Sequence, residues 1–156
     1  NPSTLFESGS AELTPTFKEI LNEFIPRYFN ILINDELKDD IMEIRIEGHT
    51  DDVPYPQLDK DPYIANVILS QKRALSVLVY IRNLTSFSEY SQEEKETLEY
   101  WITANGLSYG KSLDNQGQYA YITNESIDKA KSRRVEFRIV TKGEEMLENF
   151  VKKNGK

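Results

Sequence analysis

The spacing of apolar residues predicts a first helix. Beginning at Pro15, apolar side chains recur every three or four positions, as they do along one face of an α-helix. Thr14 can cap the free amides of the first turn, and Pro15 suits the first helical position. The pattern therefore predicts a helix that runs to about Asn34. The apolar stripe comprises Phe17, Ile20, Leu21, Phe24, Ile25, Phe29 and Leu32.

Two other stretches, 42–46 (MEIRI) and 134–139 (RVEFRI), alternate apolar and charged residues with a period of two. That period is typical of a strand with one buried and one wet face. Gly48 is expected to end the first strand. Helices can cover only the apolar face of such strands, so the pattern predicts an α+β fold, a two-layer α/β sandwich. The apolar members are Met42, Ile44, Ile46, Val135, Phe137 and Ile139.

A second helix is predicted after the irregular stretch 51–60, which is rich in proline and aspartate. Asp61 is a suitable N-cap, and Pro62 fits the position after it. The large aliphatic residues are expected on the core side of this helix. They are Ile64, Val67, Ile68, Leu75, Leu78 and Ile81.

Ser91 and Glu94 form a capping box that predicts a third helix. Its inward residues are expected to be Leu98, Trp101 and Ile102. The composition of 104–118 (ANGLSYGKSLDNQGQ) indicates a loop, and the tail from Gly143 resembles a short amphipathic helix.

Composition narrows the classes of function. The 156 residues, 38% of them hydrophobic, suit one domain over 1–156, and a net charge of −7 argues against nucleic acid as a partner. No cysteine is present, which excludes disulfides and thiolate chemistry. The sequence shows neither a long apolar run nor an export signal, and it starts abruptly with a strand-like STLF. We therefore expect a domain excised from a longer chain whose anchor or signal is missing.

A carboxylate and a guanidinium are predicted to flank one groove. Asp51 follows the first strand, and Arg73 lies two turns beyond Asn66 on the second helix, about 10.5 Å along its axis. Ser70 completes a polar stripe between them, opposite the aliphatic side. Such a pair suits a zwitterion, because Asp51 can accept from an ammonium while Arg73 binds a carboxylate. The alternative is that Asp51 and Arg73 pair with each other, which for surface residues contributes about 0–1 kcal/mol.

His49 is the only histidine and precedes Asp51 and Asp52, which raises the question of a metal or a general base. A zinc site would need more nitrogen or sulfur ligands than this chain has, so we expect no metal, and hydrogen bonds from the loop should hold His49. A hydrolase is not expected, because no Gly-x-Ser-x-Gly elbow occurs. Glycosidase chemistry lacks an environment that would separate the pKa values of two adjacent loop aspartates. No enzymatic activity and no cofactor are predicted.

Four segments in order resemble the OmpA-like peptidoglycan-binding domain. They are LFESGSAELTP (5–15), IEGHTDD (46–52), N-x-x-L-S-x-x-R-A-x-x-V (66–77) and SRRVEFRI (132–139). The resemblance implies a βαβαββ fold and non-catalytic binding of the peptidoglycan stem peptide through its zwitterionic diaminopimelate side chain. The motif leaves open whether Arg133 or Arg134 faces the ligand. The ligand-binding residues implied are Phe6, Glu7, Asp51, Asn66, Leu69, Arg73 and Arg134.

The stretch GHTDDVP is most similar to the stator B subunits of flagellar motors and related ion-driven motors. This likeness implies a periplasmic domain on a chain anchored in the inner membrane, a homodimer, and a membrane-embedded motor partner subunit. Two enlarged segments depart from the compact pattern. In one, Tyr55 or Tyr63 forms either an aromatic wall or plain loop packing, and the other, 85–101, adds a helix. The alternative function is therefore an interaction or dimerisation module that uses 85–101 and has lost wall binding.

Overall fold

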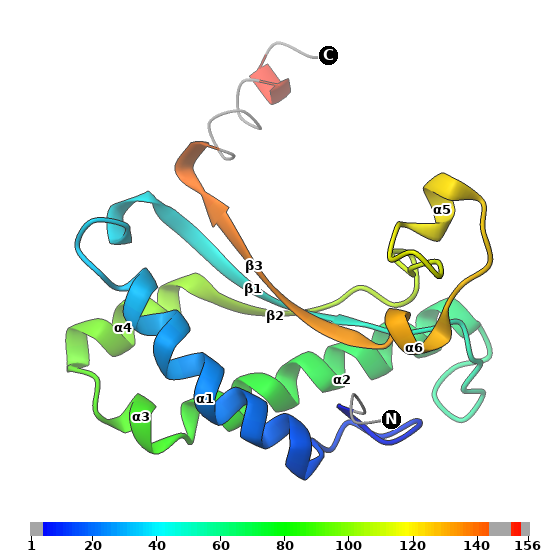
Figure 1. The fold of residues 1–156 in the computed structure, drawn as a ribbon, viewed down its shortest axis with the longest axis horizontal. Coiled ribbons are helices and arrows are strands. Elements are labelled where there is room, and N and C mark those ends of the chain that lie inside the picture. The colour runs from blue at the N-terminus through cyan, green and yellow to red at the C-terminus, as the bar shows by residue number, and fades with distance from the viewer. Residues whose placement is uncertain (1–4, 144–150, 154–156) are drawn as a thin grey trace.

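The computed structural model describes residues 5–143 and 151–153, and it forms an α+β fold in two layers (Figure 1). The predicted C-terminal helix from Gly143 falls largely outside these residues. The elements in chain order are α1 (Pro15–Leu32), the 3-10 turn η1 (Lys38–Asp40), β1 (Ile41–His49), α2 (Pro62–Arg82), α3 (Thr85–Ser88), α4 (Gln92–Trp101), β2 (Ile102–Gly106), α5 (Ala120–Thr123), α6 (Lys129–Ser132) and β3 (Arg134–Thr141).

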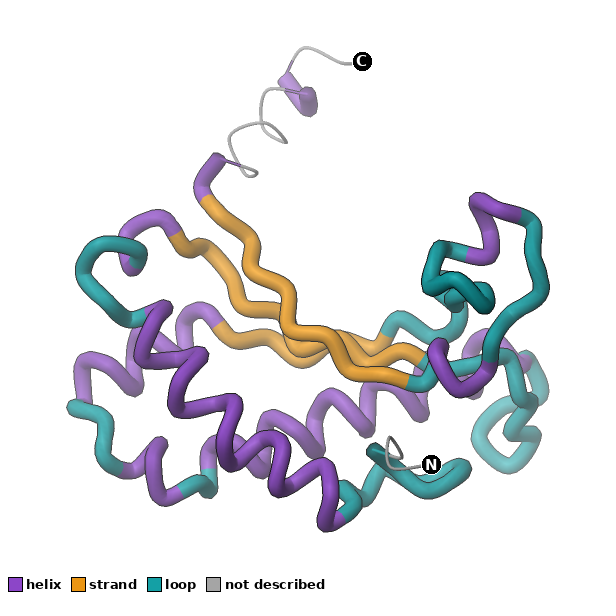
Figure 2. The backbone as a smooth tube through the Cα atoms, viewed as in Figure 1, coloured by secondary structure: helices purple, strands orange, loops and turns teal. Residues whose placement is uncertain are grey.

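The sheet has the order β2-β1-β3, with β1 parallel to β2 and antiparallel to β3. Helices α1 and α2 lie on the same side of it (Figures 1 and 2). Charged side chains of β1 and β3, which pair with one another, occupy the other face. The two-layer prediction is confirmed. The first strand implied by the βαβαββ order is reduced to an isolated bridge between Phe6 and Leu13, so the sheet itself has three strands.

Helix α1 forms as its caps and stripe predict. The Thr14 hydroxyl accepts a hydrogen bond from the Phe17 N–H at 3.2 Å, and the helix ends at Leu32, two residues before the predicted end. Ile20 is wrongly placed by the prediction: it is 48% exposed, because it lies at the edge of the stripe, outside the contact with the sheet. The buried residues of α1 are Phe17, Leu21, Ile25, Phe29 and Leu32.

Helix α2 buries a face rotated from the one predicted, and of the predicted core residues only Ile81 is fully buried. Ile64 and Leu75 are 41% and 51% exposed, whereas the buried residues are Ala65, Asn66, Leu69, Ser70, Arg73, Ala74, Val77 and Ile81. The reason is close backbone contact with the sheet: a Cβ at Gly48 would lie 2.4 Å from the Ser70 carbonyl oxygen. A Cβ at Gly106 would lie 2.5 Å from the Gln71 nitrogen. Small and polar side chains fit that approach, while Leu69, Val77 and Ile81 are the larger aliphatic residues that the helix buries.

By length and composition alone, α2 is the one helix in the described part of the chain that could cross a membrane. Its inner face is buried against the sheet within the domain, and core helices of water-soluble domains pass the same test. The apolar character of α2 therefore gives little support to a membrane span.

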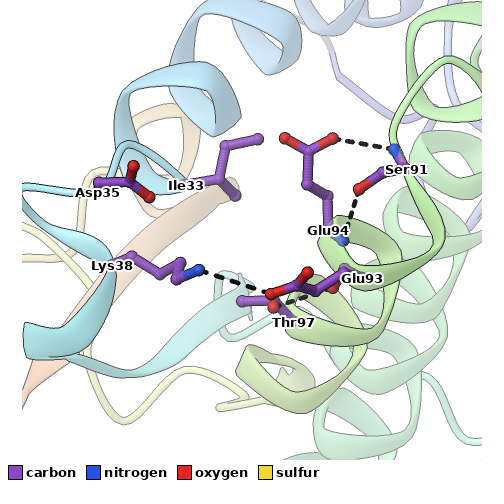
Figure 3. Close-up of a pocket in the computed structure, with 7 residues that line it drawn as sticks. All are labelled: Ile33, Asp35, Lys38, Ser91, Glu93, Glu94 and Thr97. Carbon is purple, nitrogen blue, oxygen red and sulfur yellow. Dashed lines mark hydrogen bonds and ion pairs between the residues drawn. The ribbon is translucent and has the colours of Figure 1, made fainter.

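The predicted capping box is confirmed at the start of α4. The Ser91 hydroxyl accepts from the Glu94 N–H at 3.1 Å, and the Glu94 carboxylate accepts from the Ser91 N–H at 2.9 Å (Figure 3). Leu98 and Trp101 are buried as predicted, but Ile102 begins β2 instead of continuing the helix. The loop prediction for 104–118 is wrong at its start, because 104–106 pair with β1.

Candidate functional site

Asp51 lies two residues beyond the end of β1 and is 3% exposed. Its Oδ1 accepts a hydrogen bond from the Val53 N–H at 3.0 Å, which tightens the turn into the following loop. Its Oδ2 accepts from Nη1 of Arg133 at 2.7 Å. The Arg133 side chain is 49% exposed, so this charge-assisted bond closes the outer side of the carboxylate.

Arg73 is 4% exposed and is held by the N-terminal segment. Its Nε donates to the Ser10 carbonyl at 2.8 Å and its Nη2 donates to the Glu7 carbonyl at 3.3 Å. The guanidinium also lies 4.9 Å from the centre of the Phe6 ring. Within the described residues, no carboxylate lies within the 4.0 Å that defines an ion pair with this group. Its buried charge is therefore compensated by carbonyl dipoles and a ring, without a directly paired anion.

Burial lowers the pKa of Arg73, while the nearby Tyr55 and Asp51 groups raise it and Arg133 lowers it further. Asp51, Arg133 and Arg73 are thus close enough to interact electrostatically, although Asp51 forms its ion pair with Arg133. The alternative in which Asp51 and Arg73 simply pair with each other does not describe this structure. Asp51 is ion-paired with Arg133, whereas Arg73 has no ion-paired carboxylate among the described residues.

Asn66 and Leu69 are buried on α2, with exposures of 0% and 2%. The Asn66 side-chain amide donates to the Val53 carbonyl at 2.9 Å and to the Pro62 carbonyl at 3.0 Å. It therefore holds the loop after Asp51 against the start of α2. Its Oδ1 is buried and has no hydrogen-bond partner among the described residues. Both residues are buried, so neither lies on an accessible surface.

Phe6 and Glu7 belong to the surroundings of Arg73, which both of them contact. Phe6 packs edge-on against Phe17, with ring centres 5.5 Å apart, and presents its face to the guanidinium. Glu7 uses its backbone carbonyl for Arg73 and leaves its side chain exposed. The turn between them and α1 thus forms one wall around Arg73.

Of the two loop tyrosines, Tyr55 belongs to the site. It interacts electrostatically with Arg73, and its ring closely approaches the turn at Gly9, where a Cβ would lie 3.1 Å from Cε1. Tyr63 packs edge-on against Tyr109 at 5.4 Å instead. The sequence motif did not single out Tyr55, because its position depends on how the enlarged loop folds back on the N-terminal turn.

The adjacent arginines take separate positions. Arg133 contacts Asp51, whereas Arg134 donates from Nε to Glu136 at 2.6 Å and from Nη2 to the Lys111 carbonyl at 3.1 Å. Arg134 was the residue assigned to the ligand from the sequence, and no contact joins it to Asp51 or Arg73. The two adjacent arginines of the SRRVEFRI motif indicated that one of them belongs to the site. Which of the two side chains faces Asp51 is determined only by the start of β3 at Arg134.

His49 does not form the loop hydrogen bonds expected from the sequence. It is 2% exposed, and neither ring nitrogen has a hydrogen-bond partner among the described residues. Its Nε2 lies 3.5 Å from Glu47 Oε1 and 3.7 Å from Glu136 Oε2. Burial is the largest cause that lowers the His49 pKa, followed by Arg134, and the two glutamates oppose it. The imidazole therefore faces carboxylates across the sheet, away from the loop.

Comparisons with known proteins agree with this architecture. The model of the OmpA family matches residues 5–118. Zorya protein ZorB from the Crooks strain of Escherichia coli is 33% identical over 157 residues, covering 97% of this chain. That alignment covers 59% of ZorB, so the chain spans about three-fifths of the length of this relative.

A solved structure shares this fold. The crystal structure of a MotB like protein from Desulfovibrio vulgaris superposes with a TM-score of 0.50 and 25% identity, covering 88% of this chain and 70% of that one. The OmpA-like domain of FopA1 from Francisella tularensis gives a TM-score of 0.48 and 20% identity, covering 88% of this chain and 73% of that one. With most of its length matched by the family model and a relative at 33% identity, the chain belongs to the OmpA family.

Proposed function

We propose that this domain binds the stem peptide of peptidoglycan, through a diaminopimelate-type zwitterionic end, and anchors its parent protein to the cell wall without catalysis. OmpA-like and MotB-like domains are generally peptidoglycan-binding and structural. The observation that carries the proposal is Arg73, a buried guanidinium with no ion-paired carboxylate among the described residues, located near the buried carboxylate of Asp51.

A zwitterionic guest supplies what this site lacks. A buried charge without a counter-ion is costly, and a guest carboxylate placed against Arg73 would relieve that cost. Two N–H groups of Arg73 are used by the carbonyls of Glu7 and Ser10, which leaves the rest of its five-donor fork for the guest. The guest ammonium would bind Asp51 and would share or replace its bond from Arg133. The half-exposed Arg133 can withdraw into solvent, so it acts as a competitor that the ligand displaces.

Co-sedimentation of the purified domain with peptidoglycan sacculi tests the assignment. Arg73→Lys keeps the charge but removes the fork, and Asp51→Asn keeps the shape but removes the charge, so both should lose most retention. Arg27→Lys is the matched control, because Arg27 is exposed on α1 and, within the part of the chain that the structure describes, bonds only to the Glu23 carbonyl. Circular dichroism should confirm that all three variants are folded. Full retention by folded Arg73→Lys and Asp51→Asn would refute the proposal.

We further propose that the parent protein is anchored in the inner membrane, presents this domain in the periplasm as a homodimer, and works with a membrane-embedded motor subunit. The support is the similarity to ZorB and to a MotB like protein. Protease accessibility of the domain in spheroplasts made from cells that express the full-length protein tests its location. Protection of the domain in intact spheroplasts would contradict a periplasmic position.

The alternative function assigns dimerisation to the segment 85–101. In the segment 85–101, Phe87, Leu98 and Trp101 are buried in the core at 5% exposure or less. This segment therefore covers the sheet and offers mainly polar residues to solvent. No structural observation favours that alternative over wall binding.

A further inference from the structure

A second polar cluster lies on the sheet face opposite α1 and α2 (Figure 1), separate from the proposed wall-binding site. Glu47 and Glu136 are direct partners in the antiparallel pairing of β1 and β3, and His49 follows Glu47 on the same strand face. One potential ligand atom from each of these three residues lies within 4.8 Å of the others. Like charges placed directly opposite each other on a sheet are destabilising, so this pairing needs positive charge beside it.

Arginines compensate only one oxygen of each carboxylate. Arg45 and Arg138 both donate to Glu47 Oε2, at 2.9 and 3.2 Å, and Arg134 donates to Glu136 Oε1 at 2.6 Å. The other oxygens, Glu47 Oε1 and Glu136 Oε2, face Nε2 of His49. Bound arginines fix the orientation of both carboxylates, as hydrogen-bonded outer partners do around metal ligands.

His49 is the independent sign that something belongs between these oxygens. It is 98% buried, yet neither ring nitrogen makes a hydrogen bond within the described residues. The distances from Nε2 to the two oxygens, 3.5 and 3.7 Å, are too long for good hydrogen bonds. They are close to the ligand-to-ligand separation of about 3.4 Å in a tetrahedral zinc site with bonds of about 2.1 Å.

We propose that Glu47, His49 and Glu136 form a binding site for a divalent cation of the Zn²⁺ type, with one nitrogen and two oxygen ligands and a fourth position open to water. The sequence alone did not predict this site, because Glu136 is distant from His49 in the sequence. It comes close only because β3 pairs with β1 in a register that places Glu136 opposite Glu47. The charged groups around it balance: Glu43, Glu47 and Glu136 face Arg45, Arg134 and Arg138. Because the arginines share the carboxylates, the site binds more weakly than a closed structural zinc site.

The cation would join β1 to β3 at the end of the sheet that carries the wall-binding residues. Asp51 follows His49 by two residues, and Arg133 immediately precedes the first residue of β3. Binding at the cluster therefore stiffens the frame on which Asp51 and Arg133 sit. The site stands independently of wall binding, since none of its three ligands contacts Asp51, Arg73 or Arg133 through a hydrogen bond or ion pair in the described structure.

Titration of tag-free, chelator-treated protein with ZnCl₂, followed by calorimetry and by NMR of the imidazole nitrogens, tests the proposal. The chain contains a single histidine, so every imidazole signal reports on His49. We expect one Zn²⁺ per chain, a large shift of the Nε2 resonance, and a rise in melting temperature with zinc concentration. Co²⁺ in place of Zn²⁺ should give the visible bands of four-coordinate cobalt.

Glu136→Gln is the decisive variant, because Glu136 is 41% exposed and the change keeps its shape. It should weaken zinc binding at least tenfold while the protein remains folded. Glu99→Gln is the matched control, since Glu99 is 51% exposed and pairs with Arg82 far from the cluster. Equal zinc affinity in the wild type and Glu136→Gln, or binding that leaves the His49 resonances unchanged, would overturn the assignment. Sacculus retention is measured separately, so failure of either proposal is distinguishable from failure of the other.

Discussion

Replacement of Gly48 by alanine tests the close contact that positions the two halves of the site. The added Cβ would lie 2.4 Å from the Ser70 carbonyl oxygen and 3.1 Å from its carbon. A carbon and an oxygen in contact are normally about 3.3 Å apart, so α2 and β1 must separate by about 1 Å. Both sides of this contact are backbone, so no side-chain rotation can relieve it.

The expected loss of stability follows from that displacement. Overpacking of a well-packed core costs about 1–3 kcal/mol, and this contact belongs at the upper end because neither partner can rotate away. Alanine also restricts the unfolded chain, which offsets about 0.4–1 kcal/mol. Gly48 does not have a positive φ, so backbone strain adds nothing. We therefore expect a net decrease of about 2 kcal/mol in the free energy of unfolding.

Urea denaturation followed by tryptophan fluorescence measures this change, because Trp101 is the only tryptophan and is 2% exposed. Gly110→Ala is the matched control: the nearest atoms to its Cβ lie 4.0 Å away, so it should stay within about 0.5 kcal/mol of the wild type. If Gly48→Ala is as stable as Gly110→Ala, then α2 does not rest on β1 as tightly as described and the reasoning fails.

Two further predictions concern the core and the loop before β3. Phe29→Ala should reduce the free energy of unfolding by about 3–5 kcal/mol, since Phe29 is fully buried, whereas Ile31→Ala at 60% exposure should change it by less than about 1 kcal/mol in the same urea assay. Hydrogen bonds from the Gln118 N–H and then the Thr123 hydroxyl lower the pKa of Asp114. Because the pKa of Asp114 is lower in the folded than in the unfolded protein, its carboxylate stabilises the fold. This contribution to the free energy of unfolding is complete above about pH 3.9 and is lost as the pH falls through the folded pKa. In Asp114→Asn, the free energy of unfolding should therefore fall less between neutral and acid pH than it does in the wild type. An unchanged dependence on pH would exclude this role of Asp114.

Local signals predicted the elements whose causes are local. Thr14 and Pro15 set the start of α1, and Ser91 with Glu94 set the start of α4, because a cap is completed within one turn of the chain. The alternation in β1 and β3 predicted the layer arrangement, since a strand with a charged face can be covered on one side only.

Elements that depend on distant partners were missed. Residues 104–106 have poor strand propensity, yet they form part of β2 because β1 pairs with them and the Gln71 side chain bonds to both the Ala104 carbonyl and the Gly106 N–H. The prediction of the buried face of α2 was partly wrong for a related reason. Periodicity counts large apolar residues, whereas this helix also packs closely on Gly48 and Gly106, which lie on strands elsewhere in the sequence, and it buries small and polar residues there.

The candidate site repeats this division between local and distant causes. The sequence predicted that Asp51 and Arg73 flank one groove, but it could not show which of the two adjacent arginines contacts Asp51. Successive residues of an extended chain point to opposite sides, so the first residue of β3 decides the matter. Arg133 turns to Asp51 and Arg134 turns to Glu136. One peptide bond thus separates a residue of the proposed wall-binding site from a residue that orients the proposed cation site, and any shift in the start of β3 would disturb both.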